Sequence, residues 1–273
     1  MFARCGWLLV IALACACAGP GAAAPPATPS QSVHHLTVGG LDRTYRLYRP
    51  GGLPASAPLV VMLHGGFGSA EQAERAYGWD GLADSAKFVV AYPDGVSRAW
   101  NVGGCCGQPA KQNIDDVGFV DAVVADVPGI DRRRVYATGM SNGGMMAFAL
   151  ACNTGAFAAI GPVSATQLSC PNPRPTSVMH IHGTADRMIR YDGGPGMGFA
   201  HINGPPVRDV DASWRNIDQC AGPTVTADGG VSTSTATCPG NRAVVLSTVD
   251  GGGHDWPPFA TAALWRFFRE HPQ

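Results

Sequence analysis

The chain contains several short apolar runs in which hydrophobic residues do not alternate with polar ones. Most of them end in Gly or Asp, and they cover residues 58–66, 87–95, 134–140, 157–165, 177–183 and 242–251. Runs of this kind are typical of strands that are buried on both faces. The pattern therefore predicts a mostly parallel sheet in the interior of the protein.

Helix-like segments separate several of these runs and cover residues 71–86, 115–127, 142–152 and 259–271. Residues 34–50 instead alternate apolar and polar on both sides of Gly39 and Gly40, which predicts an antiparallel hairpin. Alternating strands and helices favour an α/β sandwich around a mostly parallel sheet. Because neither a repeat of fixed period nor a second core is visible, we expect a single domain over residues 34–273.

The N-terminus has the pattern of an export signal. Arg4 precedes an apolar run, residues 7–14, that is shorter than the ~20 residues a membrane span needs, and small residues follow it. We therefore expect a signal peptide over residues 1–24, followed by a flexible linker of Pro, Ala and Gly over residues 25–33. The protein is then secreted or held at the cell envelope.

Two other interpretations of the N-terminus stay open. Cys15 and Cys17 follow small residues, as in the signal of a bacterial lipoprotein, so a lipid anchor to the membrane is one alternative. A retained anchor helix is the other, although the apolar run is short for a membrane span.

The remaining cysteines predict disulfides. Without Cys5, Cys15 and Cys17, an even number remains: Cys105, Cys106, Cys152, Cys170, Cys220 and Cys238. An even number in an oxidising compartment favours disulfides, and the absence of paired Cys-x-x-Cys or His-x-x-x-His spacing argues against a metal site. Cys220 and Cys238 flank one Gly/Ser/Thr-rich segment and form the expected pair. The connectivity of the other four stays open.

The overall charge argues against a nucleic-acid partner. The 273 residues include 19 Lys and Arg against 20 Asp and Glu, a net charge of −1, and contain no basic run. A phosphate-binding surface needs clustered basic side chains. We therefore expect a globular domain that does not bind nucleic acid. We also expect the protein to be a monomer.

Residues 134–150, RVYATGMSNGGMMAFAL, pass from an apolar strand through Gly-x-Ser-x-Gly into a helix of small residues. The glycines permit a tight strand-to-helix turn that lifts Ser141 to the carboxyl end of the sheet, where ligands bind in α/β proteins. The amide of Asn142, at the start of the helix, can stabilise an oxyanion. A tight turn without chemistry is the alternative, but the strand–turn–helix context favours Ser141 as a nucleophile.

A serine nucleophile needs a base that an acid holds in one tautomer, and in this architecture the order along the chain is Ser, Asp or Glu, His. His254 lies in a glycine-rich loop between the last apolar run and the closing helix, and is the predicted base. Asp186 lies just past the end of residues 177–183 and is the predicted acid. His180 and His182, within that run, are expected to be structural. The less well placed acids are Asp192, Asp250 and Asp255.

A second oxyanion donor is expected in the loop after residues 58–63. There the sequence reads His64-Gly65-Gly66-Phe67, similar to an HGGG-type loop whose backbone N–H groups face the carbonyl oxygen. Gly66 is the first candidate donor and Phe67 the second, while His64 is expected to brace the loop. A phosphate-binding loop is the competing interpretation, but the Gly-Lys-Ser/Thr ending is missing.

Two tryptophans are candidates for the substrate pocket. Trp100, close to Cys105 and Cys106, either lines the acyl pocket or braces a loop, and bracing is favoured. Trp256, two residues after the predicted base, either contacts an aromatic acyl group or covers the core.

Together these segments resemble the polyhydroxybutyrate depolymerase and feruloyl esterase family of α/β-hydrolases. The resemblance rests on residues 58–67, 100–108, 115–120, 131–152, 180–186 and 251–257. It implies an α/β-hydrolase fold, a secreted carboxylic ester hydrolase without a cofactor, and the same nucleophile, acid and base. It also implies feruloyl, acetyl or short hydroxyacyl esters, on a small molecule, a polysaccharide or a polyester, as substrates.

Two other functions stay open at this stage. One is an acyltransferase on the same fold, in which a sugar hydroxyl replaces water as the acceptor. The other is an exported surface-binding protein without activity, built on a hydrolase scaffold.

Overall fold

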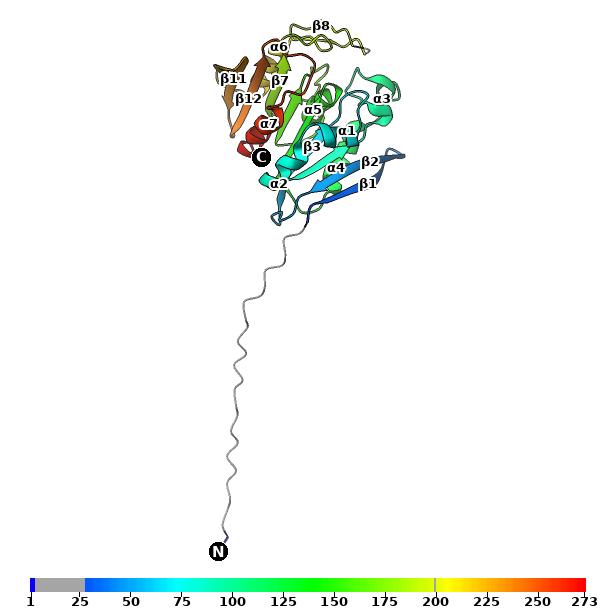
Figure 1. The fold of residues 1–273 in the computed structure, drawn as a ribbon, viewed down its shortest axis with the longest axis vertical. Helices are drawn as coiled ribbons and strands as arrows, with labels where there is room; N and C mark the ends of the chain where they lie inside the picture. Colours follow the sequence, from blue (N-terminus) through cyan, green and yellow to red (C-terminus); the bar gives the residue numbers. More distant parts are fainter. Residues whose placement is uncertain (3–27, 199) are drawn as a thin grey trace.

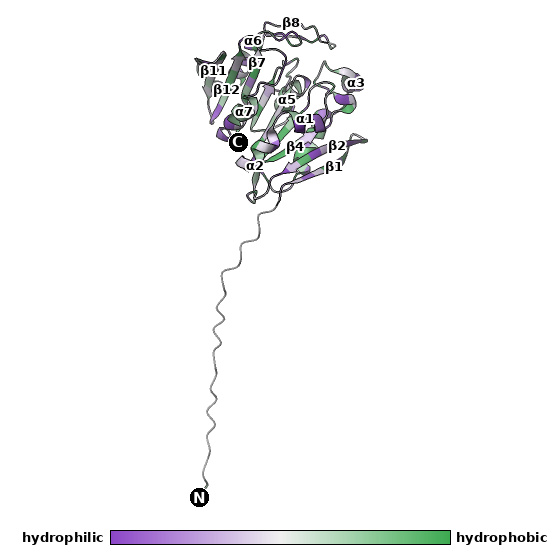
Figure 2. Cartoon of the chain, viewed as in Figure 1, coloured by the Kyte–Doolittle hydropathy of each residue, from purple (hydrophilic) through white to green (hydrophobic). Residues whose placement is uncertain are grey.

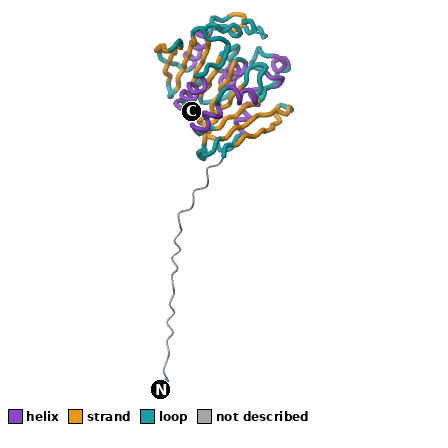
Figure 3. The backbone as a smooth tube through the Cα atoms, viewed as in Figure 1, coloured by secondary structure: helices purple, strands orange, loops and turns teal. Residues whose placement is uncertain are grey.

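A computed structural model describes residues 1–2, 28–198 and 200–273 of the chain. The predicted signal peptide, with Cys15 and Cys17, lies outside the described residues apart from Met1 and Phe2. In the described part, helices pack on both faces of one large sheet (Figure 1, Figure 3). The predicted α/β sandwich is therefore confirmed.

The large sheet has a parallel centre and an antiparallel hairpin at each end. Its strands are β1 Ser30–Val38, β2 Leu41–Arg49, β3 Ala57–Leu63, β4 Val89–Pro93, β5 Ile130–Met140, β6 Ala159–Val163, β7 Ser177–Gly183, β10 Thr224–Asp228, β11 Val231–Cys238 and β12 Arg242–Val249. They lie in the order β1-β2-β4-β3-β5-β6-β7-β12-β11-β10. The strands from β4 to β12 in this order are parallel, so their carboxyl ends meet at one edge.

Helices cover the two faces in two groups. The helices are α1 Ala70–Ala76, α2 Trp79–Ala86, α3 Gly107–Lys111, α4 Asp116–Asp126, α5 Asn142–Asn153, α6 Val207–Ile217 and α7 Ala260–Glu270, with a short 3-10 turn at Val96–Arg98. One hydrophobic cluster contains the inner sides of α4, α5 and α6. The other contains those of α1, α2 and α7. Figure 2 shows the hydrophobic positions gathered on the central strands.

Burial on both faces explains why the apolar runs do not alternate. Every residue of β3 and β7 is buried, as expected for strands covered by helices on both sides. On the α7 face, aromatic rings fill the space: Phe88 stacks on Trp265 with centroids 4.0 Å apart, and Tyr136 stacks on Phe268 at 4.9 Å. This packing holds the central strands in place, and the candidate site is built at their carboxyl ends.

Two sequence predictions need correction. Residues 71–86 form two helices instead of one, because Gly78 takes the left-handed conformation (φ 71°) that interrupts a helix and that glycine adopts readily. Residues 30–33, predicted as the end of a linker, belong to β1. The segment between Cys220 and Cys238, for which no element was predicted, forms the hairpin β10–β11 at the sheet edge, with β10 exposed and β11 mostly half-buried.

Helix α6 and one small ladder were also not predicted. Helix α6 carries Val207, Val210 and Trp214 at helical spacing on its buried side, but it follows a Gly/Pro-rich stretch that has no clear pattern. Within that stretch, a small ladder pairs β8 Gly194–Pro195 with β9 Asn203–Gly204. Throughout the described ranges, no helix has the length and apolarity that a bilayer crossing requires.

Candidate active site

Ser141 occupies the sharp turn between β5 and α5. Its backbone has φ 56° and ψ −122°, a conformation that residues with side chains rarely adopt. The Ser141 amide donates to the carbonyl oxygen of Val163 at 2.9 Å, and its carbonyl oxygen accepts from the amide of Met145, also at 2.9 Å. The turn therefore places the hydroxyl group at the carboxyl edge of the parallel strands.

Two glycines make this turn possible. A Cβ on Gly139 would lie 2.5 Å from the carbonyl carbon of Gly143. A Cβ on Gly143 would overlap the carbonyl oxygen of Leu63, at the end of the neighbouring strand β3. Any side chain at either position would require the backbone to move, which is the physical reason for the Gly-x-Ser-x-Gly pattern.

The structure brings Ser141, His254 and Asp186 together from three separate loops. Nε2 of His254 lies 2.9 Å from Oγ of Ser141, and Nδ1 of His254 lies 2.8 Å from Oδ2 of Asp186. A neutral imidazole protonated at Nδ1 donates to the carboxylate and accepts from the serine hydroxyl. This is the geometry in which the ring can take the serine proton.

Asp186 is 4% exposed and has several hydrogen-bond donors. Its Oδ1 accepts from the amides of Met188 at 2.8 Å and Ile189 at 2.9 Å. Nε2 of His182 lies 3.3 Å from its Oδ2. Burial by itself would raise the pKa of Asp186, but the hydrogen bonds from His182, His254 and the Ile189 amide outweigh it and hold the pKa well below its usual range. Asp186 therefore stays ionised.

His182 is a neighbour of the candidate acid that sequence reasoning treated as structural only. It is buried, and its Nε2 lies 2.8 Å from the carbonyl oxygen of Ile189 as well as near Asp186. The available signal was its place at the end of the strand that precedes the acid. The sequence does not show that the His182 ring points to Asp186, because this depends on the path of the loop after β7.

Hydrogen bonds join the loop of the candidate base to the loop of the candidate acid. The Ala185 amide donates to the carbonyl oxygen of Gly252 at 2.9 Å, and the Gly251 amide donates to Oγ1 of Thr184 at 2.8 Å. Oγ of Ser164 donates to the carbonyl oxygen of Asp255 at 2.8 Å. These contacts fix His254 relative to the sheet. Among the alternative acids, Asp192 and Asp255 are exposed, and Asp250 accepts from Thr184 at 3.3 Å.

The glycine loop after β3 lies against the serine turn. A Cβ placed on Gly65 would be 3.6 Å from Cβ of Ser141, and one on Gly66 would be 3.9 Å from Cβ of Asn142. The amide of Phe67 donates to the carbonyl oxygen of Arg98 at 2.8 Å, so it is already bonded to the 3-10 turn after β4. Of the two candidate donors in this loop, the structure favours Gly66.

His64 is fully buried behind this loop. Its Nδ1 lies 2.8 Å from the carbonyl oxygen of Gly65, and its Nε2 accepts from the amide of Gly95 at 2.9 Å. Burial lowers the pKa of His64, which keeps the ring neutral. A bracing role, as expected from the sequence, fits these contacts.

The two tryptophans contact different segments of the fold. Trp100 is fully buried, and its indole Nε1 donates to the carbonyl oxygen of His64 at 2.8 Å. Trp256 packs on Tyr77, with ring centroids 4.6 Å apart, and donates to Oγ1 of Thr261 at 3.0 Å. Trp100 therefore supports a loop, as the favoured interpretation had it, and Trp256 covers the edge of the core.

The cysteines pair as Cys105–Cys106, Cys152–Cys170 and Cys220–Cys238. The expected pairing of Cys220 with Cys238 is confirmed. Neighbouring residues in the chain form the first disulfide, and the second ties the end of α5 to the segment after β6. Over the part of the chain that the structure describes, no group of three or more His, Cys, Asp or Glu side chains is placed to hold a metal ion.

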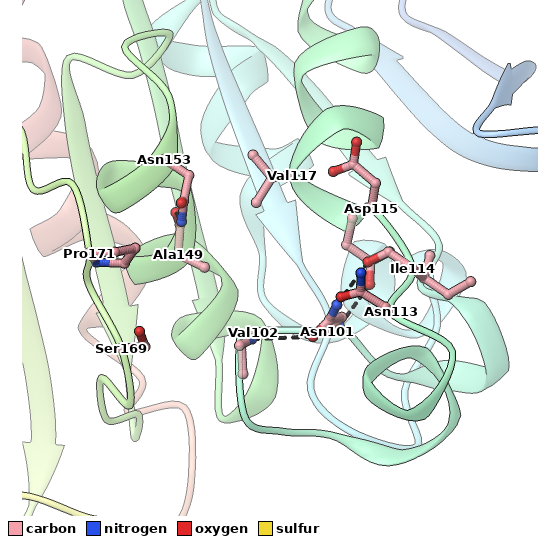
Figure 4. A pocket seen from close by; sticks show the side chains of 12 residues that line it. Asn101, Val102, Asn113, Ile114, Asp115, Val117, Ala149, Asn153, Ser169 and Pro171 are labelled. Carbon is pink, nitrogen blue, oxygen red and sulfur yellow. Dashed lines mark hydrogen bonds between the residues drawn. The ribbon is translucent and has the colours of Figure 1, made fainter.

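A cavity of about 420 Å³ lies beside α5 and away from the triad candidates (Figure 4). Figure 4 shows Asn113, Ile114 and Asp115 on one side of it and Asn153 and Pro171 on the other. Ser141, Asp186 and His254 are not among its lining residues. The cavity is therefore separate from the catalytic geometry described above.

Comparison with known proteins identifies the family. The family model for Esterase PHB depolymerase matches residues 43–185, more than half of the chain. NocK of Nocardia uniformis subsp. tsuyamanensis, a protein named as an esterase, is 33% identical over 92% of this chain and 88% of its own length. Feruloyl esterase C of Emericella nidulans is 30% identical over 83% of each chain.

The fold is also found among solved structures. Acetyl xylan esterase from Aspergillus awamori superposes with a TM-score of 0.64, at 16% identity, over 88% of this chain and 99% of that chain. At this identity the likeness concerns the fold. On the family match and the relatives, the chain belongs to the esterase PHB depolymerase family and is a serine carboxylesterase with the α/β-hydrolase fold.

Proposed function

We propose that the protein is an exported hydrolase of carboxylic esters that uses Ser141, His254 and Asp186 as a catalytic triad. The observation that carries the proposal is the continuous chain of hydrogen bonds from Oγ of Ser141 through the His254 ring to Asp186, at 2.9 and 2.8 Å. A serine with this partner set is an activated nucleophile.

The reaction has two steps, formation and hydrolysis of an acyl-enzyme, and His254 carries a proton in each. Oγ of Ser141 attacks the ester carbonyl carbon while Nε2 of His254 takes its proton, and the ionised Asp186 stabilises the resulting imidazolium. The oxyanion accepts hydrogen bonds from the amides of Asn142 and Gly66. His254 then gives the proton to the departing alcohol, leaving an acyl group on Ser141. In the second step, a water attacks the acyl carbonyl while Nε2 of His254 takes its proton; the bond to Oγ of Ser141 then breaks, His254 returns the proton to Oγ, and the acid leaves.

The substrates proposed are esters with short-chain, hydroxyacyl, acetyl or feruloyl groups. Feruloyl esterases are among the relatives at 30% identity, and the family is described as PHB depolymerases. The alcohol part belongs to a small molecule, a polysaccharide or a polyester. No cofactor is needed, because every proton transfer is between the substrate, water and the three side chains.

Export is supported by the cysteines. Three disulfides join the six cysteines of the catalytic domain, and disulfides persist in oxidising compartments outside the cytosol. The signal-like residues 1–24 agree with this interpretation. We infer a secreted or cell-envelope enzyme.

Labelling of the serine tests the catalytic assignment. The oxidised protein is treated with a fluorophosphonate ester and weighed intact by mass spectrometry, alongside the Ser141→Ala variant. As a matched control, Ser213→Ala removes an exposed serine of α6. We expect one adduct on the wild type and on Ser213→Ala, none on Ser141→Ala, and loss of most ester turnover only in Ser141→Ala. An adduct or parental turnover in Ser141→Ala would contradict the assignment.

Product analysis separates hydrolysis from acyl transfer. The wild type is incubated with an acetyl or feruloyl ester in the presence of a polyol such as glycerol. Free acid as the main product supports hydrolysis, whereas a new polyol ester as the main product supports the acyltransferase alternative. Rates of hydrolysis of acetyl, feruloyl and hydroxyacyl esters, compared side by side, identify the preferred acyl group.

A further inference from the structure

The side chain next to the candidate nucleophile has an unusual position. Asn142 is 4% exposed, and its amide group makes two hydrogen bonds to the backbone of Trp100. Its Oδ1 accepts from the Trp100 amide at 2.7 Å, and its Nδ2 donates to the Trp100 carbonyl oxygen at 3.2 Å. Two bonds to one residue fix both the position and the rotation of the Asn142 side chain, and with it the first residue of α5.

The backbone of the same turn is held on its other side. The peptide unit that carries the Asn142 N–H also carries the Ser141 carbonyl, which accepts from the Met145 amide at 2.9 Å. Because a trans peptide is planar, its N–H points opposite to its carbonyl. The Asn142 amide therefore has a fixed direction at the N-terminal end of α5, where the helix favours negative charge.

The indole of Trp100 holds the other half of the oxyanion site. Its Nε1 donates to the carbonyl oxygen of His64 at 2.8 Å, and the two rings lie with centroids 4.8 Å apart. His64 in turn donates from Nδ1 to the carbonyl oxygen of Gly65, and the Gly68 amide donates to the same oxygen at 2.9 Å. By the same planarity, a fixed Gly65 carbonyl gives the Gly66 N–H a fixed direction.

The segment that carries Trp100 is itself tied to the core. The Cys106 amide donates to the carbonyl oxygen of Trp100 at 3.1 Å, within the turn closed by the Cys105–Cys106 disulfide. The Asn101 amide donates to Oδ2 of Asp116 at 2.7 Å. Oδ1 of Asp116 accepts from Arg43 at 2.7 Å in a buried ion pair. Trp100 thus has little freedom to move.

From these contacts we propose that Trp100 is the positioning residue of the oxyanion hole and orients both donor amides. Its backbone orients Asn142, and its indole orients the His64-Gly65-Gly66 loop. Trp100 does not touch the substrate; it acts through the two amides. The inference rests on the proposed serine esterase function, because the tetrahedral intermediate of that reaction carries the oxyanion that the two amides would bind.

The test uses two variants that leave both donor amides in the chain. Trp100→Phe removes the indole donor and keeps an aromatic ring, whereas Asn142→Ala removes the side-chain clamp. Trp79→Phe is the matched control, because Trp79 is also fully buried but packs on Phe88 and Phe268 in the other core cluster. Circular dichroism and thermal unfolding establish that each variant is folded.

Steady-state kinetics with 4-nitrophenyl acetate give the main readout. We expect kcat to fall about 10- to 100-fold in Trp100→Phe and in Asn142→Ala, with KM changed less than about threefold, because the lost interactions act in the transition state. The double variant should lose more than either single variant, since Trp100→Phe weakens the hold on the Gly66 amide and Asn142→Ala the hold on the Asn142 amide. Trp79→Phe should keep the wild-type kcat.

A transition-state analogue provides a second readout that a merely structural role would not move. A trifluoromethyl ketone forms a tetrahedral adduct with the serine and places its oxyanion in the hole. We expect its affinity to fall in parallel with kcat/KM in both variants and to stay unchanged in Trp79→Phe. The pH dependence of kcat/KM should stay as in the wild type, because His254 and Asp186 are not altered.

The outcomes separate this inference from the proposed function. If Asn142→Ala and Trp100→Phe keep the kcat and analogue affinity of Trp79→Phe while Ser141→Ala is inactive, the positioning role is wrong and the triad stands. If Ser141→Ala keeps its turnover, the proposed function fails first. Should Trp100→Phe not fold, Asn142→Ala decides the question alone, and a wild-type kcat in that variant overturns the inference.

Discussion

The candidate acid Asp186 combines burial with several hydrogen-bond partners. It accepts from two backbone amides and contacts two histidine rings, so its charged form is stabilised although it is buried. Its pKa is accordingly held well below the usual range. A carboxylate that cannot take up the proton of His254 is suited to orient and stabilise the imidazolium without competing for the proton.

Replacement of Asp186 by Asn should preserve the shape of the site and remove this charge. We expect kcat for a small ester to fall roughly 10³- to 10⁴-fold in Asp186→Asn, because the imidazole loses its tautomer and its counter-charge. The exposed Asp192, a few residues along the same loop, gives the control variant Asp192→Asn, which should keep the wild-type kcat. Loss of turnover in Asp192→Asn with retention in Asp186→Asn would reassign the acid.

At the level of elements, the sequence predicts best those strands that are buried along their whole length. Strands β3 and β7 are buried throughout, so a simple apolar run identified them. Helix boundaries were harder where a single residue decides them, as Gly78 does between α1 and α2. Helix α6 was missed because its apolar stripe is short and its buried side includes a charged residue, Asp211.

Asp211 makes the stability contribution of α6 depend on pH. Burial raises the pKa of Asp211 to about 6, although Arg215, one turn later in α6, is its ion-pair partner. Its Oδ1 has no hydrogen-bond partner among the described residues. The folded carboxyl therefore binds a proton more tightly than the unfolded one, so the folded state loses stability as pH rises from about 4 to about 6.

Asp211→Asn should remove this pH dependence. We expect the free energy of unfolding of the wild type to fall relative to Asp211→Asn, by on the order of 2 kcal/mol, between pH 4 and pH 7. Urea unfolding at several pH values measures this difference. The control is Asp209→Asn, an exposed carboxylate of the same helix, whose difference from the wild type should stay constant. Parallel stability curves for the wild type and Asp211→Asn would contradict the role given to burial.

At the scale of the whole molecule, the candidate site is assembled from strand ends that are distant in sequence. Ser141, Asp186 and His254 could be predicted because each follows a recognisable strand and their order fits the fold. The clamp between Trp100 and Asn142, 42 residues apart, could not be predicted, because no local pattern reports which buried backbone a side chain meets. Contacts of His182 with the acid were missed for the same reason.

Two disulfides are expected to affect the stability of the whole domain more than the geometry of the candidate site. Cys152–Cys170 and Cys220–Cys238 each span 18 residues, and a loop of that length restricts the unfolded chain by about 3 kcal/mol in the chain-entropy model. Cys220–Cys238 joins the residues after α6 to the end of β11, in the outer part of the sheet. Its stabilising effect should therefore be separable from catalysis.

Replacement of Cys220 and Cys238 together by Ser tests this separation. We expect the melting temperature to fall by roughly 6–12 °C, which corresponds to about 3 kcal/mol for a domain of this size, while kcat at 25 °C stays within about twofold of the wild type. The reason is that the disulfide raises the free energy of the unfolded chain and leaves the triad geometry unchanged. Differential scanning calorimetry and ester kinetics on the same preparations measure both quantities. A large loss of kcat in a variant that is still folded at 25 °C would mean instead that the outer hairpin β10–β11 and α6 help to hold the loop that carries His254.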